Sequence, residues 1–164
     1  MIRQLTLEET QKYIKDDTVR PHLSADYRTT QGRQVWALFE DKYAVAHDPN
    51  PEPLAIICVA YTNCAPTNET ELNWYSAAAG EGAVTTDTAV FYTVWSYAKG
   101  AGREIVNSVA EHIQQTRSEI NRWVTLSPLT DMAKQFHLRN GAVQHSVYTT
   151  AQIFEYTHLM KETA

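Results

Sequence analysis

Four residues, Lys99-Gly100-Ala101-Gly102, place two glycines between a segment rich in β-branched and aromatic residues and a segment with helical periodicity. A turn of this kind leaves backbone N–H groups uncovered at the start of a helix, where the positive end of the helix dipole points outward. A phosphate or pyrophosphate is the natural ligand of such a turn, and Lys99 and Arg103 would add positive charge beside it. A strand, a glycine turn and a helix also occur where nothing binds, so a plain structural connection stays open.

The spacing of the glycines excludes two common kinds of phosphate-binding turn. No Gly-Lys-Ser/Thr sequence closes a P-loop, and the third glycine of the dinucleotide-binding fingerprint is missing. The turn is similar to the shorter Gly-x-Gly turn with which N-acetyltransferase-like proteins hold the pyrophosphate of coenzyme A. This resemblance implies that the cofactor contacts the end of the preceding strand and the turn itself. The expected contacts are Val94, Trp95, Lys99, Gly100, Ala101, Gly102 and Arg103.

Two polar residues further along the chain could carry chemistry. Ser127 follows a short strand in Thr125-Leu126-Ser127-Pro128, and ligands gather beyond the carboxyl ends of strands in a mostly parallel sheet. A serine before proline is equally common in plain turns. His137 lies near the C-terminus of an expected helix, where the dipole and the last carbonyls favour a histidine without any catalytic role. The two residues could face one cleft, although their spacing does not require it.

Two more residues are candidates for acid/base chemistry. Glu104 lies in the first turn of the helix that follows the glycines, where the dipole favours a carboxylate in any case. If its side chain points across the cleft, it could orient His137 or act as an acid or base itself. Tyr156, in the closing segment Phe154-Glu155-Tyr156, is a further candidate acid/base for acyl transfer.

These residues depend on a strand and a helix around the glycine turn. The segment from Ala89 to Trp95 is dense in β-branched and aromatic residues, which predicts a strand. From Arg103 onward, apolar residues recur at spacings of three and four, which predicts a helix with one apolar face. That apolar face consists of Ile105, Val106, Val109, Ala110 and Ile113.

The rest of the chain alternates strands and helices. Thr6 and Glu9 have capping-box spacing, which predicts a helix from Leu7 to about Asp16. The stretch from Thr18 to Gly32 is polar and irregular, so we predict a loop that could line a cleft. Further strands are expected at Ile2–Leu5, Arg33–Glu40, Tyr43–His47, Leu54–Thr62, Trp123–Leu126, Val143–Thr149 and Ile153–Tyr156, with a rigid proline turn at Asp48–Pro53 and a frayed tail from Leu159.

Two helices complete the expected fold. One covers Asp131–Arg139, between an N-cap at Thr130 or Asp131 and a C-cap at Asn140-Gly141. The other covers Glu69–Ala79, with Trp74 and Ala78 on one face, unless this stretch is an irregular excursion. The order predicts an α/β (α+β) fold, with a mixed, mostly antiparallel sheet and helices on both faces, in a single domain over residues 1–164.

Composition excludes several classes of protein. The chain has 164 residues, of which 43% are hydrophobic and 20% charged, a composition typical of globular proteins. No apolar run is long enough to cross a membrane. The N-terminus lacks a signal-peptide pattern, so we expect a cytoplasmic protein. The net charge of −5 argues against nucleic acid as a partner. Two cysteines, Cys58 and Cys64, predict neither a disulfide framework nor a metal site, and Cys58 is expected in the core.

Together the motifs resemble the catalytic domain of malonyl-CoA decarboxylase, in a compact form without that family's helical N-terminal domain and helical insertion. The matching segments, in the same order along the chain, are Arg33–Phe39, Glu52–Thr62, Ala89–Val94 with the glycine turn and Glu104, Thr125–Pro128 and Phe136–Ala142. The resemblance implies an N-acetyltransferase-like fold that binds a coenzyme A thioester against the glycine turn. It also implies decarboxylation by Ser127 and His137, helped by Glu104.

The implied chemistry and its alternatives lead to different products. Loss of CO2 from a malonyl thioester leaves an enolate, which Ser127 and His137 could assist by binding the carboxylate and protonating the carbon. Because the insertion is missing, the site could instead admit an amine acceptor, which would make the protein an N-acetyltransferase that uses Tyr156, His137 or Glu104. A third alternative is a module that only binds coenzyme A. An exposed edge of the sheet could also pair with the same edge of a second copy, so a homodimer stays an alternative.

Overall fold

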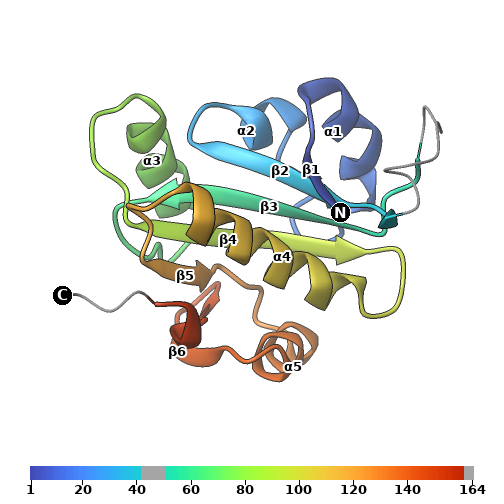
Figure 1. The fold of residues 1–164 in the computed structure, drawn as a ribbon. Coiled ribbons are helices and arrows are strands. Elements are labelled where there is room, and N and C mark those ends of the chain that lie inside the picture. The colour runs from blue at the N-terminus through green and yellow to red at the C-terminus, as the bar shows by residue number, and fades with distance from the viewer. Residues whose placement is uncertain (42–50, 161–164) are drawn as a thin grey trace.

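The computed structural model describes residues 1–41 and 51–160. Within these residues seven strands form one sheet in the order β1-β2-β3-β4-β5-β7-β6 (Figure 1). All neighbouring strands are antiparallel except β4 and β5, which run parallel. The strands are β1 (Ile2–Gln4), β2 (Arg33–Leu38), β3 (Ala55–Thr62), β4 (Thr88–Ser96), β5 (Arg122–Thr125), β6 (Val143–Val147) and β7 (Gln152–Glu155). The predicted mixed, mostly antiparallel sheet is confirmed.

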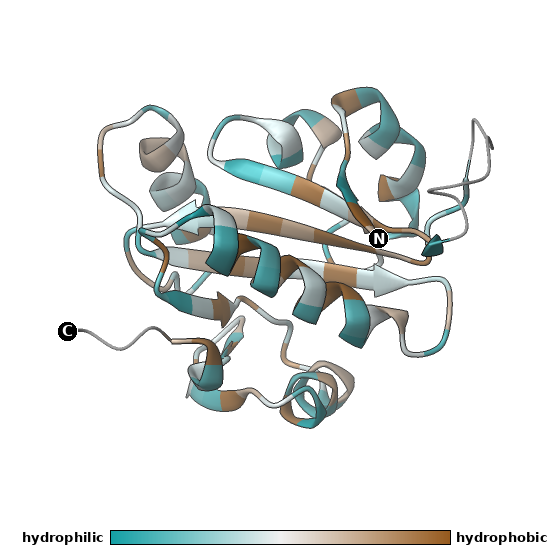
Figure 2. Ribbon diagram, viewed as in Figure 1, coloured by the Kyte–Doolittle hydropathy of each residue, from teal (hydrophilic) through white to brown (hydrophobic). Residues whose placement is uncertain are grey.

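Helices cover both faces of the sheet, as the sequence predicts. One face carries α4 (Ala101–Thr116), and the other carries α1 (Leu7–Tyr13), α2 (Ala25–Thr29) and α3 (Glu69–Gly80). In Figure 2 the outward side of α4 is hydrophilic, because its apolar residues turn toward the strands. The fifth helix, α5 (Asp131–Arg139), lies beyond β5 and packs Phe136 against the core under α4. None of the helices in the described part of the chain has the length and apolar character needed to cross a bilayer.

Strand β3 separates the two cores. All eight of its residues are buried, so neither face of the strand contacts solvent. This explains why its sequence is a nearly continuous apolar run instead of an alternating one. Ile57 and Val59 join the core under α4, whereas Ile56 and Cys58 join the core under α1, α2 and α3. Burial raises the pKa of the Cys58 thiol to about 11, which confirms Cys58 as a core residue.

Local signals in the sequence set several boundaries correctly. Thr6 accepts a hydrogen bond from the Glu9 N–H while the Glu9 carboxylate accepts one from the Thr6 N–H, which completes the predicted capping box. Thr130 caps α5 by accepting from the Ala133 N–H. Gly141 follows α5 with a φ of +96°, the left-handed conformation expected at this C-cap.

The prediction of a loop over residues 18–32 is wrong in part, because α2 lies within it. The side chain of Ser24 accepts a hydrogen bond from the Tyr27 N–H and starts this five-residue helix. Arg28 is fully buried and ties the helix to the preceding loop through hydrogen bonds to the carbonyls of Leu23 and Arg20, while its Nη1 donates to Cys58 Sγ on β3 at 3.6 Å. A helix this short has no hydrophobic period, so tertiary contacts rather than pattern define it.

Three smaller predictions also need correction. Helix α4 begins at Ala101 rather than Arg103, because Gly100 itself is the N-cap residue. The predicted helix at α3 forms, but Trp74 is 65% exposed, while Leu72 and Ser76 point inward. Leu159 belongs to a 3-10 turn, Thr157–Leu159, and packs against the core instead of fraying. The expected strand at residues 43–47 and the first part of the proline turn, residues 48–50, lie outside the described residues.

The deepest ion pair of the fold joins Asp17 to Arg28. The carboxylate and the guanidinium are 2.7 Å apart, and both side chains are at most 1% exposed. Because the carboxylate also accepts the backbone N–H groups of Val19 and Arg20, it organises the whole turn between α1 and α2.

We predict that Asp17→Asn lowers the free energy of unfolding by about 3 to 5 kcal/mol, because it leaves the Arg28 charge buried without its partner. Arg3→Gln is the matched control. It removes the exposed ion pair with Glu9, where both side chains are at least 26% exposed, and should cost less than about 1 kcal/mol. Urea denaturation measures both variants, and equal losses would contradict the assignment of Asp17–Arg28 as the structural pair.

Candidate functional site

The two parallel strands of the sheet separate halfway along β4. They pair from Thr88 with Arg122 as far as Phe91 with Thr125, after which β5 ends and β4 continues. At the same point β4 carries a bulge against β3, because Thr93 opposes Cys58 while Phe91 opposes Val59. Tyr92 is therefore the extra residue, and the bulge bends β4 away from β5.

A cavity of about 340 Å³ lies at this separation, and we call it the strand-gap cavity. Because it reaches between the strands, residues from both faces of the sheet contribute to its wall. Its lining includes Thr18 and Val19 before α2, Phe91 to Ser96 of β4, Gly102 and Val106 of α4, Leu126 to Pro128 after β5, and Thr130, Met132, Ala133, Phe136 and His137 around α5. The loop over residues 18–32 thus does line a cleft, through its first two residues.

Ser127 lines the strand-gap cavity and is held tightly in place. Its side chain is buried, and its hydroxyl lies 2.7 Å from the hydroxyl of Thr125. The backbone N–H and carbonyl of Ser127 both bond to Gln152 on β7, at 2.9 and 3.0 Å. A residue in a plain surface turn would lack these contacts, so the position of Ser127 is set by two strands rather than by the following proline.

His137 lines the same cavity from α5. Its ring is buried and stacks on Phe154 at a centroid distance of 5.4 Å, and its Nδ1 lies 2.8 Å from the hydroxyl of Tyr156. Burial lowers the pKa of His137 to about 4, so the imidazole is neutral near pH 7. Ser127 and His137, which the sequence left unconnected, therefore share one apolar-walled cavity.

Tyr156 is the partner of Nδ1 in this neutral imidazole. Burial raises the pKa of Tyr156 to about 12, so its hydroxyl keeps its proton. The same oxygen accepts from the Asn140 amide nitrogen at 3.3 Å. In the tautomer in which the hydroxyl donates to Nδ1, the imidazole carries its hydrogen on Nε2. Tyr156 itself does not line the strand-gap cavity.

The glycine turn borders a second cavity that adjoins the first. This cavity, of about 600 Å³, is lined by Gly100, Gly102 and Arg103 from the start of α4 and by Phe136 and Arg139 from α5, among others, and we call it the glycine-turn cavity. Gly100 has a φ of +79°, and a side chain at Gly102 would lie 3.3 Å from the Phe136 ring. The turn therefore favours glycine at Gly100 for its conformation, and at Gly102 a larger residue would require the Phe136 ring to shift by a few tenths of an ångström.

Arg139 is a candidate binding residue that sequence reasoning missed. It lines the glycine-turn cavity together with Arg103 and with one carboxylate, Asp131, so the charged residues that line this cavity carry a net positive charge. The signal in the sequence was the position of Arg139 three residues after Phe136, which places both on one side of α5. Positive charge beside uncovered helix N–H groups suits an anion such as a phosphate.

The remaining candidates divide between the cavities and the surface. Val94 and Trp95 line the strand-gap cavity, as expected of cofactor contacts. Ala101 is buried in the core and lines neither cavity. Lys99 and Glu104 are exposed and also line neither cavity, so Glu104 does not point toward His137. The dipole at the start of α4 accounts for a carboxylate at this position without catalysis. No cluster of metal-ligating side chains is found among residues 1–41 and 51–160.

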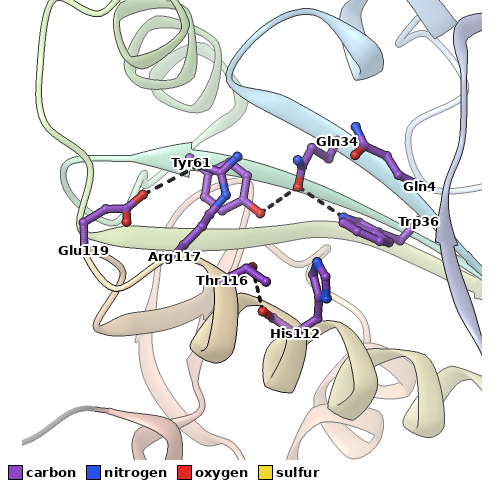
Figure 3. A pocket seen from close by; sticks show the side chains of 8 residues that line it. All are labelled: Gln4, Gln34, Trp36, Tyr61, His112, Thr116, Arg117 and Glu119. Atoms are coloured by element: carbon purple, nitrogen blue, oxygen red, sulfur yellow. Dashed lines mark hydrogen bonds and ion pairs between the residues drawn. The ribbon is translucent and has the colours of Figure 1, made fainter.

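A further cavity at the opposite end of α4 has a different character (Figure 3). Its polar groups bond to one another, since Gln34 accepts from both Tyr61 and Trp36, at 2.7 and 3.2 Å. The guanidinium carbon of Arg117 lies 3.8 Å from the centre of the Tyr61 ring. Its Nη1 lies 3.8 Å from a carboxylate oxygen of Glu119. These contacts close the edge of the core under α4, and the cavity contains none of the candidate site residues.

The sheet order, the single parallel pair with its bulge and the glycine turn define an N-acetyltransferase-like fold. No protein-family model and no curated protein matches the sequence. Among solved structures, malonyl-CoA decarboxylase from Agrobacterium vitis matches with a TM-score of 0.62 and 22% identity, over 83% of this chain and 35% of that one. This chain thus spans about a third of the decarboxylase, and the predicted resemblance to a compact form of that fold is confirmed.

Two shorter proteins match over nearly their whole length. AtaTR bound with acetyl-CoA has a TM-score of 0.57 and 12% identity, over 97% of this chain and 94% of that one. The KacTA–DNA complex has a TM-score of 0.56 and 14% identity, with the same coverage of 97% and 94%. At these identities the similarity establishes the fold, and activity has to be argued from the site.

The burial of His137 predicts a specific pH dependence of stability. The pKa of His137 is lowered from 6.5 to about 4, so the unfolded chain binds more protons than the native chain between these values. The free energy of unfolding is therefore unaffected by this group above about pH 6.5. It falls as the pH drops from 6.5 through 4, by about 3 kcal/mol in total. Denaturation at several pH values should show a steeper loss for the wild type than for His137→Gln. Parallel curves would contradict the buried, neutral imidazole.

Proposed function

We propose that the chain is an enzyme that handles acyl-CoA, with the coenzyme bound across the glycine turn and its acyl end in the strand-gap cavity. The observation that carries this proposal is that Ser127 and His137, both buried, line one cavity directly beside the glycine-turn cavity. Gly102 and Phe136 border both cavities, so a ligand lying along α4 could reach from one to the other. In this arrangement Gly100, Gly102, Arg103 and Arg139 surround the phosphates, and Val94 and Trp95 flank the arm that leads inward.

The first reaction we propose is decarboxylation of malonyl-CoA or a related acyl-CoA. Breaking the bond to the carboxylate releases CO2 and moves the electron pair into the thioester as an enolate. Ser127 can donate a hydrogen bond to the departing carboxylate. The Nε2–H of His137 can then supply the proton that turns the enolate into the acetyl thioester, and the imidazolate left behind takes a proton back from water, so that each turnover consumes one proton from solvent. A neutral imidazole suits this step, because a charged one would hold the carboxylate and oppose its loss.

The second reaction we propose is acetyl transfer from acetyl-CoA to an amine. The match to AtaTR bound with acetyl-CoA favours it, because that match covers both chains almost completely, whereas the decarboxylase match covers about a third of the decarboxylase. His137 is then the acid/base group closest to the thioester, with Tyr156 behind it. The neighbour KacTA is in a complex with DNA, so the absence of a nucleic-acid partner, expected from the net charge of −5, stays a prediction.

The products distinguish the two reactions. The purified protein is incubated with malonyl-CoA and, separately, with acetyl-CoA plus a panel of amines, and the products are identified by mass spectrometry. Acetyl-CoA formed from malonyl-CoA supports the decarboxylase, and an acetylated amine with malonyl-CoA left intact supports the transferase. If neither product forms while coenzyme A still binds, the chain is a binding module.

We predict that Ser127→Ala and His137→Gln each lower kcat of the decarboxylation by about 100-fold, because each removes a group that acts on the reacting atoms. Ser108→Ala, on α4 and outside both cavities, is the matched control and should leave kcat unchanged. Thermal melting of all three variants separates the loss of function from the loss of stability. A fall in Tm without a fall in kcat would make Ser127 and His137 structural residues.

We predict that Gly102→Val lowers the affinity for coenzyme A at least tenfold, because the new side chain covers the backbone N–H groups and pushes on Phe136. Isothermal titration calorimetry measures the dissociation constant. Phe136→Ala separates the two effects, since it frees the space without covering the backbone. Unchanged affinity in Gly102→Val, or an equal loss in Phe136→Ala, would contradict a phosphate site at the glycine turn.

A further inference from the structure

Arg20 is a buried cation that sequence reasoning passed over. It lies in the loop between the short 3-10 turn Ile14–Asp16 and α2, and its side chain is 9% exposed. The two residues before it, Thr18 and Val19, line the strand-gap cavity. An arginine is seldom buried unless its donors are satisfied, so the partners of this guanidinium indicate what it does.

The guanidinium of Arg20 joins β4 to the end of β5. Its Nε donates to the carbonyl of Tyr92 at 2.9 Å, and its Nη2 donates to the carbonyl of Leu126 at 2.8 Å. Tyr92 is the bulged residue of β4, and Leu126 is the first residue after β5. The ladder between the two strands ends at Phe91 and Thr125, so beyond that point it offers these carbonyls no partner. Arg20 supplies donors at the place where the strands separate.

We propose that Arg20 is a positioning residue of the acyl-CoA site, which keeps β4 and β5 apart at a fixed distance and so holds the strand-gap cavity open for the acyl group. This inference rests on the proposed function, and it assigns a role to a residue that does not touch the substrate. The carbonyl that Arg20 holds on the β5 side belongs to Leu126, the residue directly before Ser127. Fixing that carbonyl fixes the direction in which Ser127 leaves the strand.

The geometry requires an arginine at this position. Two N–H groups of one planar fork reach two carbonyls on different strands, while a third arm forms an ion pair with Glu69 at 2.6 Å. A lysine has a single ammonium at the end of a flexible chain and cannot hold both strands in one plane. Glu69 in the first turn of α3 also lies 2.5 Å from Nε2 of His22, so the far side of the guanidinium is anchored outside the cavity.

The backbone of Arg20 is fixed as firmly as its side chain. The Asp17 carboxylate accepts the Arg20 N–H at 3.0 Å, and Arg28 donates to the Arg20 carbonyl at 2.6 Å. Because Asp17 and Arg28 form the buried ion pair described above, the position of Arg20 depends on the core rather than on the loop. The loop thus places a cation at the strand separation and cannot move it without breaking buried contacts.

This role predicts a change in turnover rather than in cofactor binding. The groups proposed to hold the phosphates lie at the start of α4 and on α5, away from Arg20, so the affinity for coenzyme A should change less than about threefold in Arg20→Gln. The thioester, in contrast, would no longer be aligned with Ser127 and His137. We expect kcat to fall at least tenfold in Arg20→Gln, and by an intermediate amount in Arg20→Lys.

Arg33→Gln is the matched control. Arg33 is also buried, and it bonds to Ser76 and Asn73 on α3, none of which lines the strand-gap cavity. Both substitutions remove a buried guanidinium, so both should lower Tm, but only the Arg20 variant should change kcat. Hydrogen–deuterium exchange adds a readout that needs no activity. We expect faster exchange at the amides of Leu126 and Ser127 in Arg20→Gln and not in Arg33→Gln.

The outcomes separate this inference from the proposed function. If the wild type neither binds coenzyme A nor converts an acyl-CoA, the proposed function is wrong. The positioning role of Arg20 in catalysis then fails with it. If the wild type is active and Arg20→Gln keeps its kcat, or exchanges at Leu126 and Ser127 no faster than Arg33→Gln, Arg20 is only a stabilising residue. A selective loss of kcat together with local exchange supports the positioning role.

Discussion

The separation of β4 from β5 is the constraint on which the rest of the structure depends. A sheet is stable when each strand pairs with its neighbour, and two strands that diverge leave backbone groups and side chains facing a gap. This protein accommodates the gap in three ways. A bulge at Tyr92 turns β4 aside, helix α5 with Phe136 and His137 closes the gap on one side, and Arg20 binds the free carbonyls on the other.

The two adjoining cavities offer contrasting environments. The glycine-turn cavity is bordered by arginines and by the start of a helix, so it suits negative charge. The strand-gap cavity is walled largely by apolar side chains, and the burial of His137 keeps its imidazole neutral. A thioester bound across both would have its charged end in the polar environment and its reactive end in the more apolar one. In an apolar environment, each donor that faces the reacting atoms acts more strongly than it would in water.

How far the sequence predicts this arrangement depends on the range of the interactions involved. The glycine turn, the strand before it and the cap of α5 are local features, and they form where the sequence predicts them. That Ser127 and His137 line one cavity could be inferred only through a family resemblance, because their positions depend on β7 and on Tyr156 at the far end of the chain. The role of Arg20 could not be inferred, since its partner Leu126 lies about 100 residues away. Helix α2 was missed because five residues show no hydrophobic period, although Ser24 was available as a local cap. For Glu104 the local chemistry and the resemblance point in different directions, because the helix dipole alone accounts for a carboxylate at this position and the residue lines neither cavity.

The position of β7 determines which part of the site can fold last during synthesis. Strand β7 lies between β5 and β6, although it is the last of the described strands in the chain. During synthesis the glycine turn and α4 can dock on the sheet early, but β5 keeps an unpaired edge until residues 152–155 have emerged from the ribosome. Only then do Ser127 gain its backbone partner and His137 the hydroxyl of Tyr156. A nascent or shortened chain could therefore acquire its phosphate-facing end while its reactive end is still unformed.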